Sequence, residues 1–364
     1  MNKKAENFLS NYFNKNNATL TGKGATALWS IYKTLDKPRV IVQANLCLSP
    51  VFTLLYADKE PVFCDVLSNG NINPELVEKI LAERDDVAAI LAVHTYGIVC
   101  DMDRLQEISK KNNVLLIEDA CQALGGRYSD GSLLGTKGDI SIISFGHTKI
   151  LELGGGGAIL TDNDNLIKEV NHHLSTVKEV KNITNLQQKY SNLYYSIFNA
   201  GSIDRKFFKL FHAFPDIFKD LYFKEVDKGL PSKVIENILK LEKIVSERKD
   251  IAKKYAEKLK DINGIKIFYD DQTGVPWRFT FSINAKIRDK MVAHLREKSF
   301  DVSSWYPSIV DWFEVSEGTS SNFPESLKLE KEVINLWVTP EYQGEKSDLL
   351  IEEIIKFDTV LRKT

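Results

Sequence analysis

One lysine and one aspartate stand where they could act together on an aldehyde cofactor. Lys149 ends the segment Ser144-Phe-Gly-His-Thr-Lys149 and is soon followed by four consecutive glycines, Gly154 to Gly157. Asp119 ends a largely apolar run that begins at Leu115. An amine can hold an aldehyde as a Schiff base, and a carboxylate can keep a pyridinium nitrogen protonated. These are the two groups that a pyridoxal phosphate enzyme needs from its protein.

Each residue also has an ordinary structural explanation. A single lysine is usually a surface residue, and a lysine beside glycines can bind phosphate, although the P-loop order of glycines before Lys-Ser/Thr is absent here. Asp119 could simply cap the helix that follows its strand. Glu118 should point to the opposite face of that strand. Gln122 should share the face of Asp119 and could bind the phenolic oxygen of the cofactor.

A phosphate group needs free N–H groups, such as those at the start of a helix. Gly24-Ala25-Thr26 opens a segment with helical apolar spacing, and Thr26 could add a hydroxyl. Ser144 is a second candidate donor. The alternative is an ordinary capped helix.

Short apolar runs alternate with amphipathic stretches between about residues 20 and 165, and this pattern predicts the elements that position these side chains. Several runs lack polar alternation, which is typical of strands covered on both faces by helices. The expected strands are 40–42, 61–66, 87–94, 114–118, 140–145 and 158–161. The alternation predicts a mainly parallel α/β sheet, whose ligands gather beyond the carboxyl ends of the strands. Asp119, His94 and the loop of Lys149 fall there.

The remainder of the chain is expected to be helical and then α+β. Residues 195–225 are rich in phenylalanine and should form helices that cover a core or a partner subunit; a membrane-surface helix is the alternative. Residues 231–260 should form one long helix, because apolar residues recur at helical spacing. A smaller lobe should follow, with a strand at 277–283 and helices at 288–296 and 346–362.

Composition argues against several classes of protein. The 364 residues include 43% hydrophobic and 27% charged residues, as in a globular protein, and favour two packed lobes. A net charge of −2 gives no sign of nucleic-acid or membrane electrostatics. No apolar run is long enough to span a bilayer, and no signal peptide is seen. Four scattered cysteines without a CxxC pair indicate reduced thiols and a cytoplasmic location.

Taken together, these segments resemble the DegT/StrS family of pyridoxal phosphate-dependent sugar aminotransferases. The resemblance covers most of the chain and is strongest over residues 20–165. It is carried by the following segments: Gly24-Ala-Thr-Ala-Leu28, Pro61-Val-Phe-Cys-Asp-Val66, Val93-His-Thr-Tyr-Gly97, Glu118-Asp-Ala-Cys-Gln-Ala-Leu-Gly125, Leu134-Gly-Thr-Lys-Gly-Asp139 and Ser144-Phe-Gly-His-Thr-Lys149. It implies the aspartate aminotransferase (type I) fold, with a large cofactor-binding domain at 1–235 and a small C-terminal α+β domain at 236–364.

The resemblance also implies a role for each matched residue. Lys149 would form the Schiff base and shuttle protons, Asp119 would face the pyridine nitrogen, and Gln122 would face the ring oxygen. Gly24, Ala25, Thr26 and Ser144 would bind the phosphate. Cys47 stands where many relatives have a ring-stacking aromatic residue, and Ile150 replaces an asparagine. The family's subunit-bridging segment is poorly matched around Asp227.

Five further residues are candidates for substrate contact. His94 and Tyr96 could touch a substrate or pack in the core, and His147 could touch a substrate. Arg278 could bind an anionic group, although a surface arginine on a strand is the better expectation. Tyr306 should edge the mouth of the site. No histidine or cysteine spacing indicates a metal site.

The resemblance therefore implies an aminotransferase that takes an amino group from a donor, expected to be glutamate, and gives it to a nucleotide-linked keto sugar for a surface polysaccharide. It also implies a homodimer with sites at the interface. A small phosphorylated ketone is an alternative acceptor. Two alternative functions remain. The first is a sugar dehydratase, although some relatives that dehydrate their sugar carry histidine in place of the lysine. The second is a non-catalytic homologue that acts as a partner or regulator.

Overall fold

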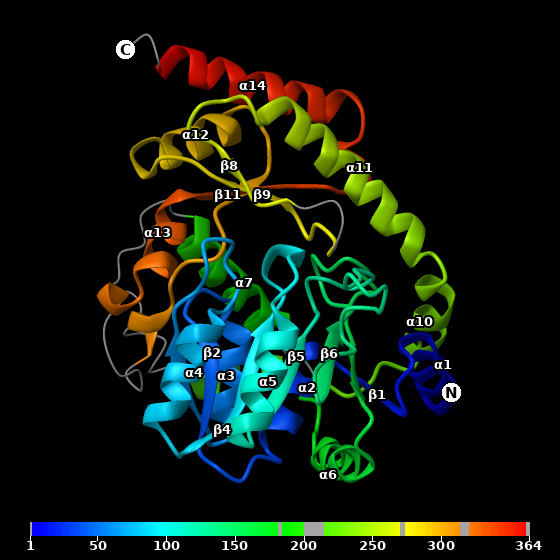
Figure 1. Cartoon of the computed structure of the whole chain (residues 1–364). Coiled ribbons are helices and arrows are strands. Elements are labelled where there is room, and N and C mark those ends of the chain that lie inside the picture. Colours follow the sequence, from blue (N-terminus) through cyan, green and yellow to red (C-terminus); the bar gives the residue numbers. More distant parts are fainter. Residues whose placement is uncertain (1, 181–183, 200–214, 270–273, 314–319, 362–364) are drawn as a thin grey trace.

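The computed structural model describes residues 2–180, 184–199, 215–269, 274–313 and 320–361. Figure 1 shows the large sheet and the helices that flank it in the lower part of the view, with a smaller C-terminal lobe above them. The large sheet has seven strands in the order β1-β7-β6-β5-β4-β2-β3. Their bounds are β1 Asn17–Thr21, β2 Arg39–Gln43, β3 Glu60–Cys64, β4 Val87–Val93, β5 Leu115–Asp119, β6 Ile140–Ser144 and β7 Gly157–Thr161.

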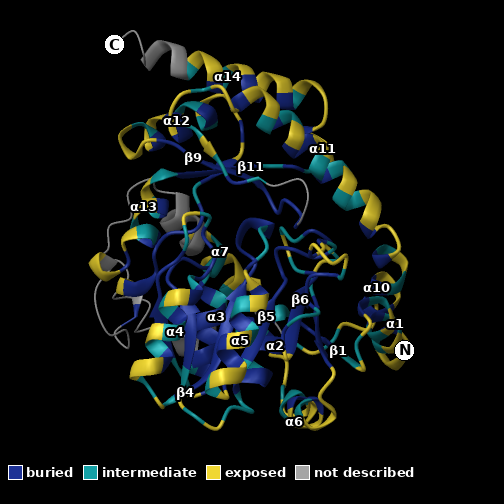
Figure 2. Cartoon of the chain, viewed as in Figure 1, coloured by how far each residue is buried: buried dark blue, intermediate teal, exposed yellow. Residues whose placement is uncertain are grey.

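The six predicted strands are confirmed as β2 to β7, because each observed strand overlaps an expected one. β2, β3, β4, β5 and β6 pair in parallel, whereas β7 runs antiparallel to β6 and to β1. β1 was not predicted, because its sequence Asn-Ala-Thr-Leu-Thr has no apolar run. Every residue of β4 is buried, and Figure 2 shows the sheet as the buried layer between helices with exposed outer faces.

Helices flank the sheet in two groups. α4 packs on α5, while α2 packs on α3 and α6. The helices up to residue 222 are α1 Asn2–Phe13, α2 Gly24–Tyr32, α3 Leu48–Tyr56, α4 Pro74–Glu83, α5 Met102–Asn112, α6 Asp164–Ser175, α7 Thr184–Asn199 and α9 Pro215–Tyr222, with the short 3-10 helix η1 Thr95–Gly97. The Phe-rich segment is helical in α9 and in the end of α7; residues 200–214 lie outside the described part of the chain.

The predicted single helix over 231–260 is wrong. The structure has two helices, α10 Leu230–Ile238 and α11 Leu241–Leu259, separated at Leu239 and Lys240. α10 packs on α1 of the large domain, whereas α11 packs on α14 Glu345–Leu361 of the C-terminal lobe. The apolar spacing runs through both helices, but their buried faces meet different partners, so the chain bends between them.

The C-terminal lobe is an antiparallel sheet with helices, as expected. Its strands, in the order β10-β11-β9-β8, are Val302–Ser303, Val333–Leu336, Phe279–Ser282 and Lys266–Ile267. Its other helices are α12 Ala285–Glu297 and α13 Pro324–Glu332, with the 3-10 helices η3 Val310–Trp312, η4 Ser320–Asn322 and η5 Pro340–Tyr342. The buried apolar residues form two clusters, and one contains only residues from 251 to 354. A domain boundary at residue 235 remains a prediction.

Two further observations concern the chain as a whole. Within its described residues, none of the helices has the length and apolar character needed to cross a membrane. All four cysteines are free thiols.

Candidate active site

Three candidate residues lie at or just after the carboxyl ends of three parallel strands, at one edge of the sheet. Asp119 is the last residue of β5, Ser144 is the last residue of β6, and His94 follows β4. Carboxyl ends of parallel strands meet at one edge, so the three residues lie near one another. The Asp119 side chain is buried, and its Oδ1 accepts a hydrogen bond from the Cys121 N–H at 2.9 Å. Asp119 thus also stabilises the turn that leads to Gln122.

Lys149 lies in a tight turn after β6. The Phe145 carbonyl accepts hydrogen bonds from Leu153 N (3.0 Å) and Gly155 N (3.3 Å), which folds the chain back toward β7. Gly154, Gly155 and Gly156 have positive φ angles of 84°, 147° and 97°, which L side chains rarely adopt. The glycine run therefore allows the chain to turn back into β7, and Lys149 lies in this turn at the edge of the sheet.

Asp119 and Lys149 both act electrostatically on Cys47, the residue before α3. Burial raises the pKa of the Cys47 thiol, the Lys149 ammonium lowers it, and the Asp119 carboxylate raises it again. The buried Cys121 thiol has a raised pKa from its burial and from Asp119, and Lys149 acts against that shift. The lysine, the carboxylate and both thiols therefore share one electrostatic neighbourhood.

The start of α2 offers backbone N–H groups to a ligand. Its N-cap residue, Lys23, makes no side-chain capping bond and pairs with Gly156 in an isolated parallel bridge. The first amides of a helix have no acceptor within the helix itself. A Cβ at Gly24 would lie 3.2 Å from Ser144 Cβ and 3.3 Å from its Oγ. The glycine thus allows the helix start and the serine hydroxyl to approach each other closely, so that both can face one anion.

The Thr26 hydroxyl is not available to a phosphate, which corrects that part of the expectation. It donates to the Tyr222 carbonyl at 2.7 Å and accepts from Lys224 N at 3.3 Å. A hydroxyl has one proton to donate, and this one is used. The residues that follow α9 therefore lie against the helix start, and Thr26 can offer a phosphate only its amide.

Gln122 is held in a defined orientation by two tyrosines. Its Oε1 accepts from Tyr96 N at 3.1 Å, and its Nε2 donates to the Tyr306 hydroxyl at 3.2 Å. The Tyr306 N–H in turn donates to the Tyr96 hydroxyl at 3.1 Å. An amide nitrogen carries two protons, so one Gln122 N–H is left for a further acceptor.

These groups fit a pyridoxal phosphate cofactor. An amine, a carboxylate, an amide N–H and an uncapped helix start lie at one edge of the sheet, and they match the aldehyde, ring nitrogen, ring oxygen and phosphate. The hydroxyl of the buried Tyr32 lacks a hydrogen-bond partner within the described residues. Its pKa is raised by burial, by Asp119 and by Cys47. A buried polar atom without a partner beside Asp119 is expected where a polar ligand binds.

Two histidines lie apart from this arrangement. His94 is fully buried: its Nε2 is 3.0 Å from Glu118 Oε1, and its Nδ1 accepts from Cys100 N at 3.0 Å. Both ring nitrogens are engaged inside the protein, which favours the core-packing alternative over substrate contact. The His147 side chain is 74% exposed, and its Nδ1 lies 2.8 Å from Glu152 Oε1. It therefore lies on the outer side of the Lys149 turn.

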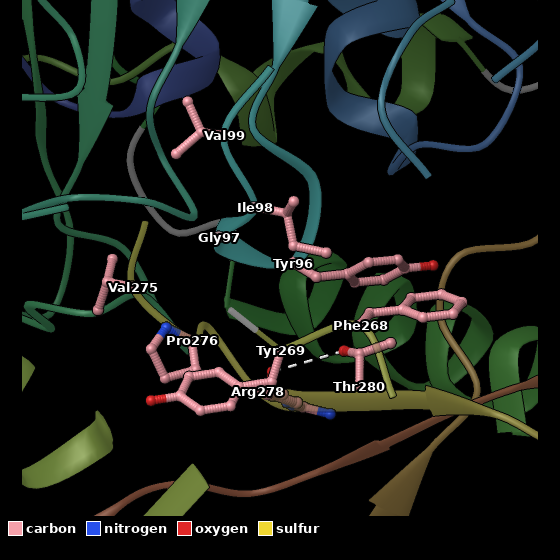
Figure 3. A pocket seen from close by; sticks show the side chains of 10 residues that line it. All are labelled: Tyr96, Gly97, Ile98, Val99, Phe268, Tyr269, Val275, Pro276, Arg278 and Thr280. Atoms are coloured by element: carbon pink, nitrogen blue, oxygen red, sulfur yellow. Dashed lines mark hydrogen bonds between the residues drawn. The ribbon is translucent and has the colours of Figure 1, made fainter. Parts of the chain in front are cut away.

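Arg278 is buried, which corrects the expectation of a surface arginine. Its guanidinium lies over the rings of Trp277, Trp305 and Trp337, at 4.6, 5.2 and 3.8 Å from their centroids. With Tyr96 it lines a small pocket of about 20 Å³ formed by residues 96–99, 268–269, 275–276, 278 and 280 (Figure 3). The Tyr96 and Phe268 rings lie side by side in that wall, with centroids 6.3 Å apart. The pocket adjoins the Gln122 side of the site.

Some residues of the site were not predicted. Cys121 could have been noticed, because it lies between Asp119 and Gln122 in the sequence. Tyr32, Tyr222 and Trp277 carry no local signal, because tertiary packing brings them to the site. In the part of the chain that the structure describes, no three His, Cys, Asp or Glu residues form a group that could hold a metal ion.

Comparison with known proteins agrees with this geometry. The model of the DegT/DnrJ/EryC1/StrS aminotransferase family matches residues 1–196 and 233–355. A dTDP-3-amino-3,6-dideoxy-alpha-D-galactopyranose transaminase from Aneurinibacillus thermoaerophilus is 26% identical over 92% of this chain and 84% of its own. A pleiotropic regulatory protein from Geobacillus stearothermophilus is 25% identical over 87% of this chain and 78% of its own.

Other matches are partial or structural. A GDP-perosamine synthase from Caulobacter vibrioides is 32% identical, but the match covers only 44% of each chain. Several curated relatives are likewise matched over less than half of their own length. The crystal structure of NtdA from Bacillus subtilis, with its cofactor PMP bound, superposes with a TM-score of 0.76 at 21% identity, over 98% of this chain and 77% of its own. This likeness confirms the predicted fold.

Proposed function

Because the chain belongs to the DegT/DnrJ/EryC1/StrS aminotransferase family, whose members depend on pyridoxal phosphate, we propose that it transfers an amino group from glutamate to a nucleotide-linked keto sugar. The observation that carries this proposal is the position of Asp119 at the end of β5 and of the Lys149 turn just after β6, the parallel strand beside it. Pyridoxal phosphate supplies an aldehyde that takes up an amino group and a ring that withdraws electrons from the bond being broken.

The residues of the site have distinct tasks in this reaction. Lys149 Nζ would hold the aldehyde, and its amine would carry the proton that leaves the donor's α-carbon. Asp119 keeps the ring nitrogen protonated, and the remaining Gln122 N–H binds the ring oxygen. Ser144 and the amides of residues 24–26 bind the phosphate. By the family resemblance, Cys47 would stand at the position from which an aromatic residue stacks on the ring in many relatives.

The sugar acceptor is supported by the relatives. The transaminase and the synthase named above carry a nucleotide-linked sugar in their names, with the nucleotides dTDP and GDP. An amino sugar made in this way would serve a surface polysaccharide. Four free thiols support a reducing, cytoplasmic setting, and the family resemblance supports a homodimer with a site at each interface.

The test begins with the purified full chain and added pyridoxal phosphate. A visible absorption band should appear and should be lost in Lys149→Ala but not in Lys168→Ala, which changes an exposed lysine of α6. Absence of the band from the unaltered protein would refute the assignment and would favour a regulator without cofactor.

Amino donors are then added to the loaded protein. Glutamate should move the visible band to the near ultraviolet, and a nucleotide-linked keto sugar should restore it. A band that appears but does not respond to glutamate would show that the donor, or transamination itself, is wrong. A band that responds to glutamate but never to keto sugars would place the error in the acceptor.

A further inference from the structure

Two bulky residues beside the site have left-handed backbone conformations. Tyr96 and Thr148 both have a φ of 62°. The other described non-glycine residues with positive φ are three Asn or Asp residues and Ser299, which are small and polar. A left-handed conformation is a genuine outlier for a β-branched or aromatic residue. Such strain persists only where the surrounding structure enforces it, and it is concentrated at functional sites.

The same residue binds both strained turns. The Trp277 indole Nε1–H donates to the Thr148 carbonyl at 2.7 Å, and the Trp277 backbone N–H donates to the Tyr96 carbonyl at 3.1 Å. Thr148 and Tyr96 lie 129 and 181 residues away from Trp277 in the sequence. Trp277 thus reaches from the C-terminal part of the chain to two loops at the edge of the large sheet.

Each strained residue stands directly beside a candidate cofactor residue. Thr148 precedes Lys149, and its own N–H donates to Glu152 Oε2 at 2.9 Å. The Tyr96 N–H donates to Gln122 Oε1, the bond that orients the Gln122 amide. The peptide groups that flank both residues are therefore held in place, and the conformations of the two turns decide where Lys149 and Gln122 point.

Trp277 is itself firmly placed. Its side chain is buried and stacks on Trp305 and Tyr306, with centroids 6.0 and 5.9 Å away. Its chain segment is hydrogen-bonded to η1, because Val275 N donates to Gly97 O at 3.1 Å. A Cβ at Gly97 would lie 1.7 Å from Val275 O, so the two backbones touch. A residue held in this way can enforce strain in its partners.

We propose that Trp277 is a positioning residue for Lys149 and Gln122: it holds the left-handed turns at Thr148 and Tyr96 and thereby presents the amine and the amide to the cofactor. This inference rests on the proposed function. It assigns to the C-terminal part of the chain a direct part in the geometry of the Schiff-base lysine. The competing explanation is that Trp277 only fills the core.

Trp277→Phe separates the two explanations, because it keeps an aromatic ring and removes the indole N–H. Trp337→Phe is the matched control: the Trp337 indole N–H also donates a 2.7 Å bond, to Asp301, and its ring also lies on Arg278. In chain loaded with pyridoxal phosphate, Trp277→Phe should reduce the visible circular dichroism per bound cofactor. It should lower kcat about 10-fold or more with little change in the KM for the donor. Trp337→Phe should alter neither.

A second substitution tests the strain itself. Glycine adopts a positive φ without cost, whereas alanine does not. Added to Trp277→Phe, Thr148→Gly should therefore restore most of the circular dichroism and kcat, and Thr148→Ala should restore neither. The inference is overturned if Trp277→Phe behaves like Trp337→Phe, or if glycine and alanine act alike. Failure of the unaltered protein to bind the cofactor would instead count against the proposed function.

Discussion

Glu118 and Asp119 are consecutive residues of β5, yet their carboxylates lie in opposite surroundings. Asp119 lies near Lys149 and Cys47. Glu118 is completely buried and accepts hydrogen bonds from the Tyr128 hydroxyl at 2.6 Å and from Lys137 N and Gly138 N at 2.8 and 2.7 Å. The period-two alternation of a strand separates the two acids, so that one serves the site and the other stabilises the loop around it.

Asp119→Asn should impair the reaction without unfolding the protein. Asparagine keeps the oxygen that accepts from Cys121 N but loses the charge that faces the ring nitrogen. We expect kcat to fall about 100-fold or more, the scale of losing a charge-stabilising group in a dry site. Steady-state kinetics and thermal unfolding, measured side by side, check this. An unchanged kcat would remove Asp119 from the reaction.

Tyr128→Phe should lower stability in a pH-dependent way. Burial alone would raise the pKa of Glu118, but hydrogen bonds from His94, Tyr128 and Gly138 hold it at about 2. Removing one bond to a buried charged acceptor should cost about 1.5–3 kcal/mol of unfolding free energy at neutral pH.

The pH dependence of that cost follows from linkage. The pKa of Glu118 is lower in the folded state than the value of about 4.3 in the unfolded state, so the stabilisation is complete above about pH 4.3 and is lost as pH falls toward 2. The difference in unfolding free energy between the unaltered protein and Tyr128→Phe should therefore shrink over that range. Denaturant titrations at several pH values test it, and a difference that stays constant would contradict this account.

His147→Ala and Glu152→Ala should differ although the two side chains contact each other. An exposed contact of this kind contributes at most about 1 kcal/mol, so His147→Ala should lower kcat by no more than about five-fold. Glu152 also accepts from the Thr148 N–H, so Glu152→Ala should loosen the Lys149 turn and lower kcat further. A large loss in His147→Ala would return His147 to the list of substrate contacts.

Asp65→Ala should weaken the attachment of α13 to the large domain. The buried Asp65 carboxylate accepts from Glu325 N at 3.0 Å and Ser326 N at 2.9 Å, at the start of that helix. Loss of such a cap costs about 0.5–2 kcal/mol. The control is Asp85→Ala, because Asp85 is an exposed residue of the loop between α4 and β4. Equal unfolding free energies of the two variants would show that the cap is unimportant.

The strands and the candidate cofactor residues could be predicted because their signals are local. Continuous apolar runs such as that of β4 are typical of strands that are buried on both faces of the sheet. Asp119, Ser144 and His94 follow such runs, so their placement at one edge of the sheet follows from the parallel topology. The prediction of a single helix failed for α10 and α11. One continuous apolar spacing runs through both helices, but they pack against different partners.

Local sequence patterns were therefore enough to predict the layers of the fold and the edge of the sheet where the candidate residues lie. The partners of those residues became visible only in the folded chain. His94 is engaged by Glu118 and Cys100, the Thr26 hydroxyl by Tyr222, and the Thr148 carbonyl by Trp277. Hydrophobic periodicity is a property of neighbouring residues, whereas these partners lie far apart in the chain and meet only when the whole fold packs.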